Sequence, residues 1–286
     1  MKQPRFYEKR PKSRGLLPLD IYKHEFDTPG RIVYAHWHEE AEILSADCAG
    51  VITIEGNTYP FRHGDLLFVN PNCLHHVTTS TGGILYALVF GYEYLEFKGK
   101  DYCQDYIIEP LKNGTLLFPT VLQKGEKTFD LLRDDLSTIV HYYGSDISGK
   151  EMKIKSCLYN ILFLLHSTDT LVSIQDPQKI SDRDQVSYVK NSILFMEKNL
   201  AKPLTVEAIA NNISVSKYHY IRTFHEITGF TPIVFLRDLR VQRATEYLLA
   251  GSTVTQAAMM CGFNNISYFI RIFRQRYGVS PGQYRR

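Results

Sequence analysis

The sequence predicts an α+β protein of two domains: an N-terminal β-barrel with following helices, and a C-terminal all-α domain of two helix-turn-helix units joined by a long helix. Three observations predict this fold. The first 125 residues contain short segments rich in Val, Ile, Tyr and Phe that Gly, Pro and Asn interrupt. Residues 205–286 contain one helical pattern twice, with the copies 49 residues apart. A chain of 286 residues with 44% hydrophobic content is long and apolar enough for two cores.

The chain begins with a basic, irregular segment, residues 1–20, that contains three prolines. We interpret it as an N-terminal arm, and the simplest expectation is a frayed terminus. The barrel is predicted to follow as residues 21–125. Its predicted strands are 31–38, 41–46, 51–55, 57–62, 65–70, 74–79 and 84–90. Gly56-Asn57 and His63-Gly64-Asp65 are predicted hairpin turns.

Two helical stretches, 127–143 and 150–166, are predicted within a helical segment of residues 126–167. The second stretch has an apolar stripe at helical spacing, part of which we expect to pack on the barrel. Residues 168–183 contain Asp176-Pro177 and several charges, which is typical of a linker. The all-α domain is then predicted to occupy residues 184–286.

Each copy of the repeat has the local signals of a short helix, a turn and a longer helix. Ser216 and Asn265 are predicted N-caps of the two longer helices, because their side-chain oxygens can accept from free backbone N–H groups. Gly229 and Gly278 are expected just past the ends of these helices, with Pro232 and Pro281 starting the next ones. Aromatic and aliphatic residues at i, i+4 and i+7 form the predicted buried rows: Tyr220, Phe224 and Ile227, then Phe269, Phe273 and Tyr277.

The opposite face of each longer helix is polar and basic. Arg222 and Arg271 occupy the same repeat position on these faces. An Arg can bridge O6 and N7 of guanine in the major groove, and small or apolar neighbours suit thymine methyl groups. An arginine that is merely solvated is the alternative for a single helix, but two equivalent faces in a duplicated unit favour contact with DNA.

A continuous helix over 232–249 is predicted between the copies. At about 1.5 Å per residue it would span roughly 27 Å, comparable with the roughly 34 Å between adjacent major-groove faces on one side of B-DNA. The charge distribution supports DNA binding: residues 183–286 contain 14 Lys or Arg against 6 Asp or Glu, while the whole chain has a net charge of only +3.

Cysteine usage and hydropathy indicate the compartment. The five cysteines show no paired or Cys-x-x-Cys spacing, and the first residues lack an apolar stretch. No run approaches the roughly 18 apolar residues that a membrane span needs. We therefore expect a reduced, cytoplasmic protein with no membrane partner.

The C-terminal hundred residues resemble the DNA-binding domain of the AraC/XylS family of bacterial transcriptional regulators. The residues that carry the resemblance are Ala208-Ile209-Ala210, Ser214 to Ser216, Phe224, Thr228-Gly229, Thr231-Pro232, Leu239-Arg240, Ala244, Leu248-Leu249, Cys261-Gly262-Phe263, Tyr268-Phe269, Phe273, Tyr277-Gly278, Ser280-Pro281 and Tyr284-Arg285. One departure is Ala257-Ala258-Met259-Met260, which replaces the usual Ile-Ala pair of the second unit.

The resemblance implies that both longer helices contact the bases of double-stranded DNA. Together with the exposed faces, it gives the predicted DNA-binding residues: Ser216, Lys217, Tyr218, Ile221, Arg222, Asn265, Ser267, Ile270, Arg271 and Arg274. It also implies a homodimer that forms through the second helix after the barrel, with Lys155, Leu158, Tyr159 and Leu162 as dimerisation residues, and contact with RNA polymerase. In relatives an arm like residues 1–20 can close over a bound effector.

Within the barrel, Gly30-x5-His36-x-His38-x3-Glu42 and Gly64-x6-Pro71-x3-His75 resemble the two cupin motifs. In a continuous strand, His36, His38 and Glu42 would share one face because even numbers of residues separate them. His75 or His76 could complete the cluster. The second motif lacks its middle Gly and its terminal Asn.

Three interpretations of this cluster remain open. His36, His38, Glu42 and His75 are typical ligands of a divalent first-row metal ion. As an effector site, the same four residues would hydrogen-bond a small molecule between walls that include Tyr34, Tyr59 and Tyr86. The histidines could also be purely structural. No cofactor is required by any motif, and the metal is an optional one.

The sequence therefore predicts a DNA-binding transcriptional regulator, expected to be an activator, whose N-terminal barrel binds a small-molecule effector. A carbohydrate-related effector rests on the family's tendency alone. We expect no enzymatic activity. The alternatives are a metal-dependent cupin enzyme with an appended DNA-binding domain and a regulator that needs no effector.

Overall fold

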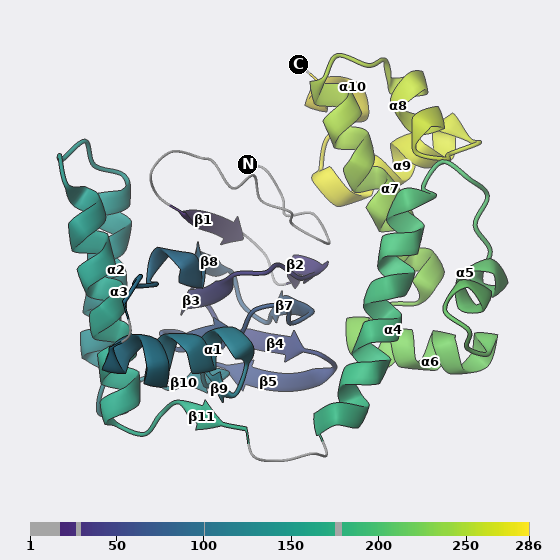
Figure 1. Cartoon of the computed structure of the whole chain (residues 1–286). Coiled ribbons are helices and arrows are strands. Elements are labelled where there is room, and N and C mark those ends of the chain that lie inside the picture. The colour runs from purple at the N-terminus through teal and green to yellow at the C-terminus, as the bar shows by residue number, and fades with distance from the viewer. Residues whose placement is uncertain (1–17, 27–29, 100, 175–178, 286) are drawn as a thin grey trace. The chain divides into compact units, whose positions relative to one another are not determined.

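The computed structural model describes residues 18–26, 30–99, 101–174 and 179–285, and it divides into two compact units (Figure 1). The sensor unit comprises the described residues up to 174, and the helical unit begins at Lys179. Most of the predicted arm lies outside the described residues. Among the helices of the described ranges, none contains an apolar stretch that could span a membrane.

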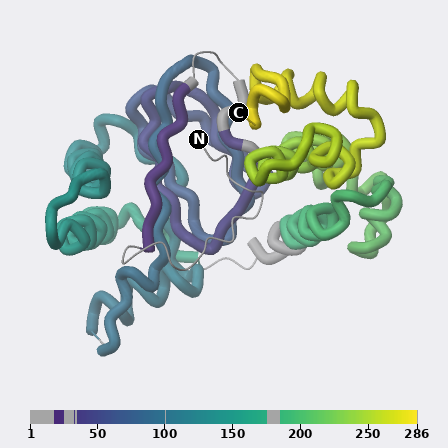
Figure 2. Tube along the Cα trace, turned by 90° about the horizontal axis from the view of Figure 1, so that it is seen from above, coloured from purple at the N-terminus to yellow at the C-terminus, as the bar shows by residue number. Residues whose placement is uncertain are grey.

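The sensor unit contains two main antiparallel sheets. The five-stranded sheet has the order β1 (Leu19–Phe26), β8 (Gly83–Phe90), β3 (Ala41–Asp47), β6 (Leu66–Val69) and β10 (Val121–Leu122). The four-stranded sheet has the order β2 (Gly30–His36), β7 (His75–Thr79), β4 (Gly50–Ile54) and β5 (Asn57–Phe61). In Figure 2 the strand traces curve into a ring with α2 and α3 outside it.

The interior between the sheets is filled by alternate residues of both. Leu44, Leu67 and Ala87 from the five-stranded sheet share one buried cluster with Ile52 and Val77 from the four-stranded sheet. Successive side chains of a strand point to opposite faces of the sheet, so every second residue points into this interior. The predicted β-barrel is therefore confirmed, with its strands arranged as two facing sheets.

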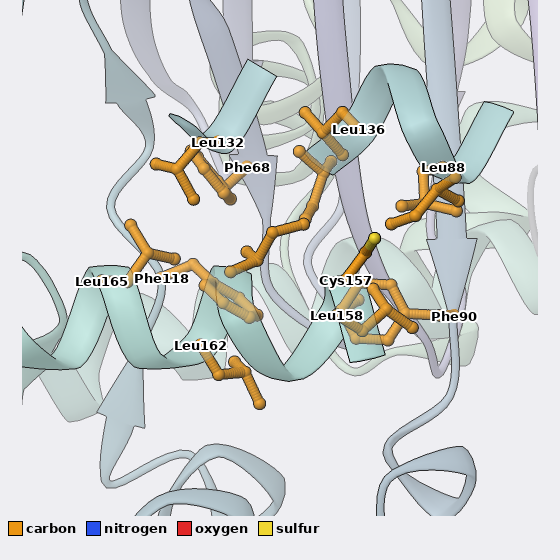
Figure 3. Close-up of a cluster of buried hydrophobic side chains, with 14 of the residues drawn as sticks. Phe68, Leu88, Phe90, Phe118, Leu132, Leu136, Cys157, Leu158, Leu162 and Leu165 are labelled. Atoms are coloured by element: carbon orange, nitrogen blue, oxygen red, sulfur yellow. The ribbon is translucent and has the colours of Figure 1, made fainter. Parts of the chain in front are cut away.

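The outer face of the five-stranded sheet packs against two antiparallel helices, α2 (Phe129–Tyr143) and α3 (Lys150–Ser167). Phe68 and Phe90 of the sheet meet Leu132 of α2 and Leu158 of α3 in this second core (Figure 3). Shorter elements complete the unit: η1 (Tyr92–Tyr94), the π-helix η2 (Gln104–Ile108), α1 (Glu109–Asn113), β9 (Leu116–Leu117) and β11 (Val172–Ser173). The apolar stripe of α3 thus belongs to the core of the sensor unit.

Four local predictions for the sensor unit need correction. The β4–β5 turn is Glu55-Gly56, with φ of 50° and 88°, so the predicted Gly56-Asn57 turn was one residue too late. Strand β2 ends at His36 and does not reach residue 38. Strand β1 begins at Leu19 inside the predicted arm, and β11 lies inside the predicted linker, where it pairs with β9.

The helical unit consists of seven helices in the described residues: α4 (Lys179–Lys198), α5 (Val206–Asn212), α6 (Lys217–Thr228), α7 (Pro232–Leu249), α8 (Val254–Met260), α9 (Ile266–Tyr277) and α10 (Pro281–Tyr284). Helix α7 has the predicted bounds and packs against both α6 and α9. Helix α4 begins at Lys179, so it takes up the end of the predicted linker.

The local signals of the repeat act as predicted. The side chain of Ser216 accepts from the N–H of His219, and that of Asn265 accepts from Tyr268. Gly229 and Gly278 end α6 and α9 in the left-handed region, with φ of 70° and 72°. Capping chemistry is local, which is why the sequence predicts it well.

The repeat does not have one constant offset, however. The N-caps of the short helices, Thr205 and Thr253, are 48 residues apart, whereas Ser216 and Asn265 are 49 apart. The turn of the second unit therefore contains one extra residue. The 49-residue offset predicted throughout is wrong for α5 and α8, and Glu207 of α5 is equivalent to Thr255 of α8.

Candidate functional site

The solvent-facing side of α6 carries the first set of predicted DNA-binding residues. Burial of Tyr220, Phe224 and Ile227 fixes the rotation of this helix. Consequently Ser216, Lys217, Tyr218 and Arg222 are exposed and Ile221 is half-buried. Tyr218 is almost fully open to solvent, with 85% of its surface exposed.

Helix α9 presents an equivalent surface. Phe269 and Phe273 are fully buried against α7 and α8. Asn265, Ser267, Ile270, Arg271 and Arg274 are all exposed. A helix that exposes arginine, hydroxyl and aliphatic groups on one side has the donors and apolar contacts that base edges in the major groove require.

The basic residues of the two faces differ in their partners. Lys217 forms an ion pair with Glu207 of α5. Nε of Arg222 donates to Oε1 of Glu226 at 2.8 Å, one helical turn away. The guanidinium of Arg271 instead lies 5.3 Å from the centre of the Tyr268 ring.

A second candidate site lies inside the sensor unit, where His36, His38, Glu42 and His75 are all buried. Their potential ligand atoms all lie within 4.8 Å of one another. They do not share one strand, as the spacing suggested: His36 ends β2, His38 lies in the following connection, Glu42 is in β3 and His75 begins β7. His36 and His75 are paired across β2 and β7, which brings the two motifs together.

Backbone carbonyls orient two of the imidazoles. Nδ1 of His38 lies 3.0 Å from the carbonyl of Glu40, and Nδ1 of His75 lies 2.9 Å from that of Cys73. A carbonyl only accepts, so Nδ1 of each ring must carry the proton. Each Nε2 therefore faces the cluster, 3.2 Å (His38) and 3.0 Å (His75) from Oε2 of Glu42.

The carboxyl of Glu42 is held in its ionised form. Burial by itself raises the pKa of Glu42, but hydrogen bonds and charge from His38 and His75, which require a proton on Nε2 as well as on Nδ1, outweigh burial and hold that pKa well below its usual value. If both imidazoles are neutral, their Nε2 lone pairs face a carboxylate oxygen, which is repulsive. A cation among these atoms, or a proton on a ring, removes the conflict.

Comparison with known proteins gives two family matches. Residues 18–98 match the model of an AraC-like ligand binding domain, and residues 209–286 match a helix-turn-helix domain model. The TetD protein of transposon Tn10 from Escherichia coli is 30% identical over 99 residues, 34% of this chain and 72% of that protein.

The chain belongs to the AraC/XylS family of transcriptional regulators. The chain is also similar to two further relatives. The HTH-type transcriptional regulator YfiF of Bacillus subtilis, whose own function is uncharacterised, is 24% identical over 290 residues, 95% of this chain and 89% of that protein. The bifunctional transcriptional activator/DNA repair enzyme AdaA of Bacillus subtilis is 30% identical over 109 residues, so this chain spans only 50% of its length.

The aromatic walls predicted for the AraC-family ligand domain are only partly in place. Tyr59 is half-buried and packs against the cluster between the sheets. Tyr86 is wrong as a wall residue, because it alternates with Leu85 and Ala87, which face the interior. The side chain of Tyr34 lies outside the described residues. Tyr22, which the sequence analysis missed because no strand was predicted before residue 31, packs against the interior cluster.

The predicted dimerisation residues of α3 also need correction. Leu158 and Leu162 are 1% and 2% exposed, because they pack in the core with α2 and the sheet. Tyr159 donates its hydroxyl to the carbonyl of Leu95, and Lys155 lies over the Tyr94 ring at 5.4 Å. These side chains hold α3 on its own unit, so the two leucines are not available to a second chain.

Proposed function

We propose that this AraC-family chain is a sequence-specific DNA-binding transcriptional regulator, controlled by an effector that binds in the N-terminal barrel. The observation that carries the proposal is the pair of equivalent exposed faces on α6 and α9, each with an arginine at the same repeat position. The long helix α7 between them has 18 residues, which span about 27 Å.

Substitution of the two arginines tests whether these two faces contact bases. Arg222→Ala and Arg271→Ala should each cost about 1–3 kcal/mol at the specific site and relax the base preference there. Equilibrium binding to a duplex selected from a random pool, and to a random-sequence duplex, measures both effects. An equal loss on the two duplexes would show that the arginines contact phosphates only.

For the barrel, we propose that His36, His38, Glu42 and His75 hold a divalent first-row metal ion, which would itself be the effector or bind a polar one. A metal-ligating imidazole characteristically donates a hydrogen bond from the N–H of its second ring nitrogen to a backbone carbonyl, as His38 and His75 do. Three neutral imidazoles and a carboxylate suit such an ion. Bound there, the ion would supply positive charge and coordination positions for a polar ligand.

Thermal unfolding of protein freed of metal by chelation tests this part. Addition of Zn²⁺ or Mn²⁺ should raise the melting temperature, because a ligand that binds only the folded state stabilises it. A set of sugars, each with and without metal, tests the carbohydrate-related effector. A shift with sugar alone would favour the metal-free effector site, and no shift with any addition would favour regulation without an effector.

We also propose a homodimer, formed through the exposed side of α2 and α3 in place of the buried leucines. Leu131, Met152 and Phe163 are 55%, 79% and 61% exposed there. Exposed apolar side chains of this size favour burial against another chain. The molar mass from light scattering at micromolar concentration decides between monomer and dimer. Contact with RNA polymerase stays a prediction from the family.

A further inference from the structure

The two helix-turn-helix units have the same scaffold but different charge. Residues 206–228 contain Lys217 and Arg222 against Glu207 and Glu226. Residues 254–277 contain three arginines and no acidic residue. The positions equivalent to the two glutamates are Thr255 and Gln275, by the offsets of 48 and 49 residues.

Both glutamates of the first unit are paired with the basic groups of its exposed face. Glu207 binds Lys217 across the α5–α6 turn, and Glu226 binds Arg222 along α6. The side chains of Arg222 and Glu226 are 80% and 52% exposed, so the pair is solvated and contributes little to stability. In the structure, this pairing lays the Arg222 guanidinium along α6, toward Glu226.

The second unit has no such internal competitor. In the described part of the chain, neither Arg271 nor Arg274 lies within ion-pair distance of a carboxylate, and Arg271 packs on Tyr268. Gln275 occupies the position four residues after Arg271 that Glu226 occupies after Arg222. Phosphates therefore meet net positive charge at α9 and nearly balanced charge at α6.

We propose that Glu226 makes the first unit the more strictly sequence-discriminating of the two, while the second unit contacts bases as well and supplies most of the general affinity for DNA. This inference rests on the proposed DNA-binding function. On a non-cognate duplex, moving Arg222 to a phosphate leaves the Glu226 carboxylate close to the negative backbone, which is unfavourable. On the cognate duplex, Arg222 contacts a base while the Glu226 carboxylate keeps the Arg222 guanidinium oriented. Glu226 is therefore a positioning residue.

Reciprocal substitutions test the proposal with matched geometry. Glu226→Gln removes the acid from the first unit, and Gln275→Glu introduces it at the equivalent exposed position of the second. Binding of the full chain to a duplex selected from a random pool, and to a random-sequence duplex of equal length, is measured at several salt concentrations. Circular dichroism on each variant checks that the helices remain folded.

We expect Glu226→Gln to raise affinity for the random duplex roughly three- to tenfold and to lower the ratio of specific to random affinity. We expect Gln275→Glu to weaken random-duplex binding by a similar factor and to reduce the steepness of its salt dependence by about one phosphate contact. Glu226→Asp keeps the charge but shortens the reach to Arg222. It should keep random-duplex binding weak and still lower the specific affinity.

The outcomes separate this inference from the proposed function. A pool that enriches no sequence would contradict the proposed function itself, and this inference with it. Enrichment with an unchanged affinity ratio in Glu226→Gln would overturn the inference alone. A Glu226→Asp variant that matches the native chain on both duplexes would show that charge acts without positioning, and would overturn the positioning role.

Discussion

At the scale of single residues, the orientation of His38 and His75 is the most informative feature of the sensor unit. A hydrogen bond from Nδ1–H to a backbone carbonyl orients each ring, so each Nε2 points toward Glu42. Such an arrangement is expected where the ring must offer a lone pair. It is the arrangement that the proposed metal site requires.

Substitution of Glu42 tests this account of the cluster. Glu42→Gln removes the only carboxylate among the four candidate ligands while it preserves shape, so Zn²⁺ affinity should fall by at least about tenfold. Competition with a chromophoric chelator measures the affinity. His63→Ala, at a histidine whose side chain is 70% exposed, is the control for adventitious surface binding. Unchanged affinity in Glu42→Gln would rule the cluster out as the metal site.

The sequence identified the four residues of this cluster for a reason that was partly wrong. Even spacing suggested one strand face, but His38 lies beyond the end of β2 and Glu42 lies in the next strand. The residues converge because β2, β3 and β7 meet at one end of the two sheets, and strand pairing of this kind is non-local. Tyr86 was misplaced for a related reason, because the face of a strand depends on a register that spacing within one segment does not show.

At the scale of elements, local chemistry was predicted well and packing was not. Helix α7 has the predicted bounds because a proline begins it and no helix-breaking residue interrupts it. Strand β1 was missed because its evidence lies in its pairing with β8, where Leu19 is opposite Phe90. The stripe of α3 was correctly recognised as apolar, but its pattern could not show whether Leu158 and Leu162 face the sheet or a second chain.

Gly262, in the turn of the second helix-turn-helix unit, provides a test at this scale. Its φ is +78°, and an added Cβ would lie 2.5 Å from the carbonyl oxygen of Leu200. Gly262→Ala should therefore destabilise the helical unit by about 3 kcal/mol or more, from the left-handed backbone and the clash together. Chemical denaturation measures the loss.

Gly278 is the matched control for that substitution. Its φ is +72°, but nothing lies within 4 Å of an added Cβ. Gly278→Ala should cost only about 1–2 kcal/mol, the usual cost of the left-handed conformation. Equal losses in the two variants would contradict the close approach of the turn to Leu200.

At the scale of the whole molecule, the two units differ in charge and in architecture. The helical unit carries a clear excess of basic residues within a chain of net charge +3. Ligand control then requires that the effector favour one arrangement of the chain over another, since a ligand with equal affinity for both shifts nothing. The sequence predicted both units because each has its own local repeat or motif, whereas their coupling depends on contacts that no local pattern encodes.

We infer from the length of α7 that α6 and α9 contact two consecutive major grooves of one duplex. In a duplex selected from a random pool, insertion of about five base pairs between the segments that α6 and α9 contact turns one segment to the opposite side of the DNA helix. Because α7 is a continuous helix, we predict that affinity falls at least about tenfold, as expected when specific base contacts are lost. Affinity unchanged by the insertion would show that α6 and α9 do not both contact bases of one duplex.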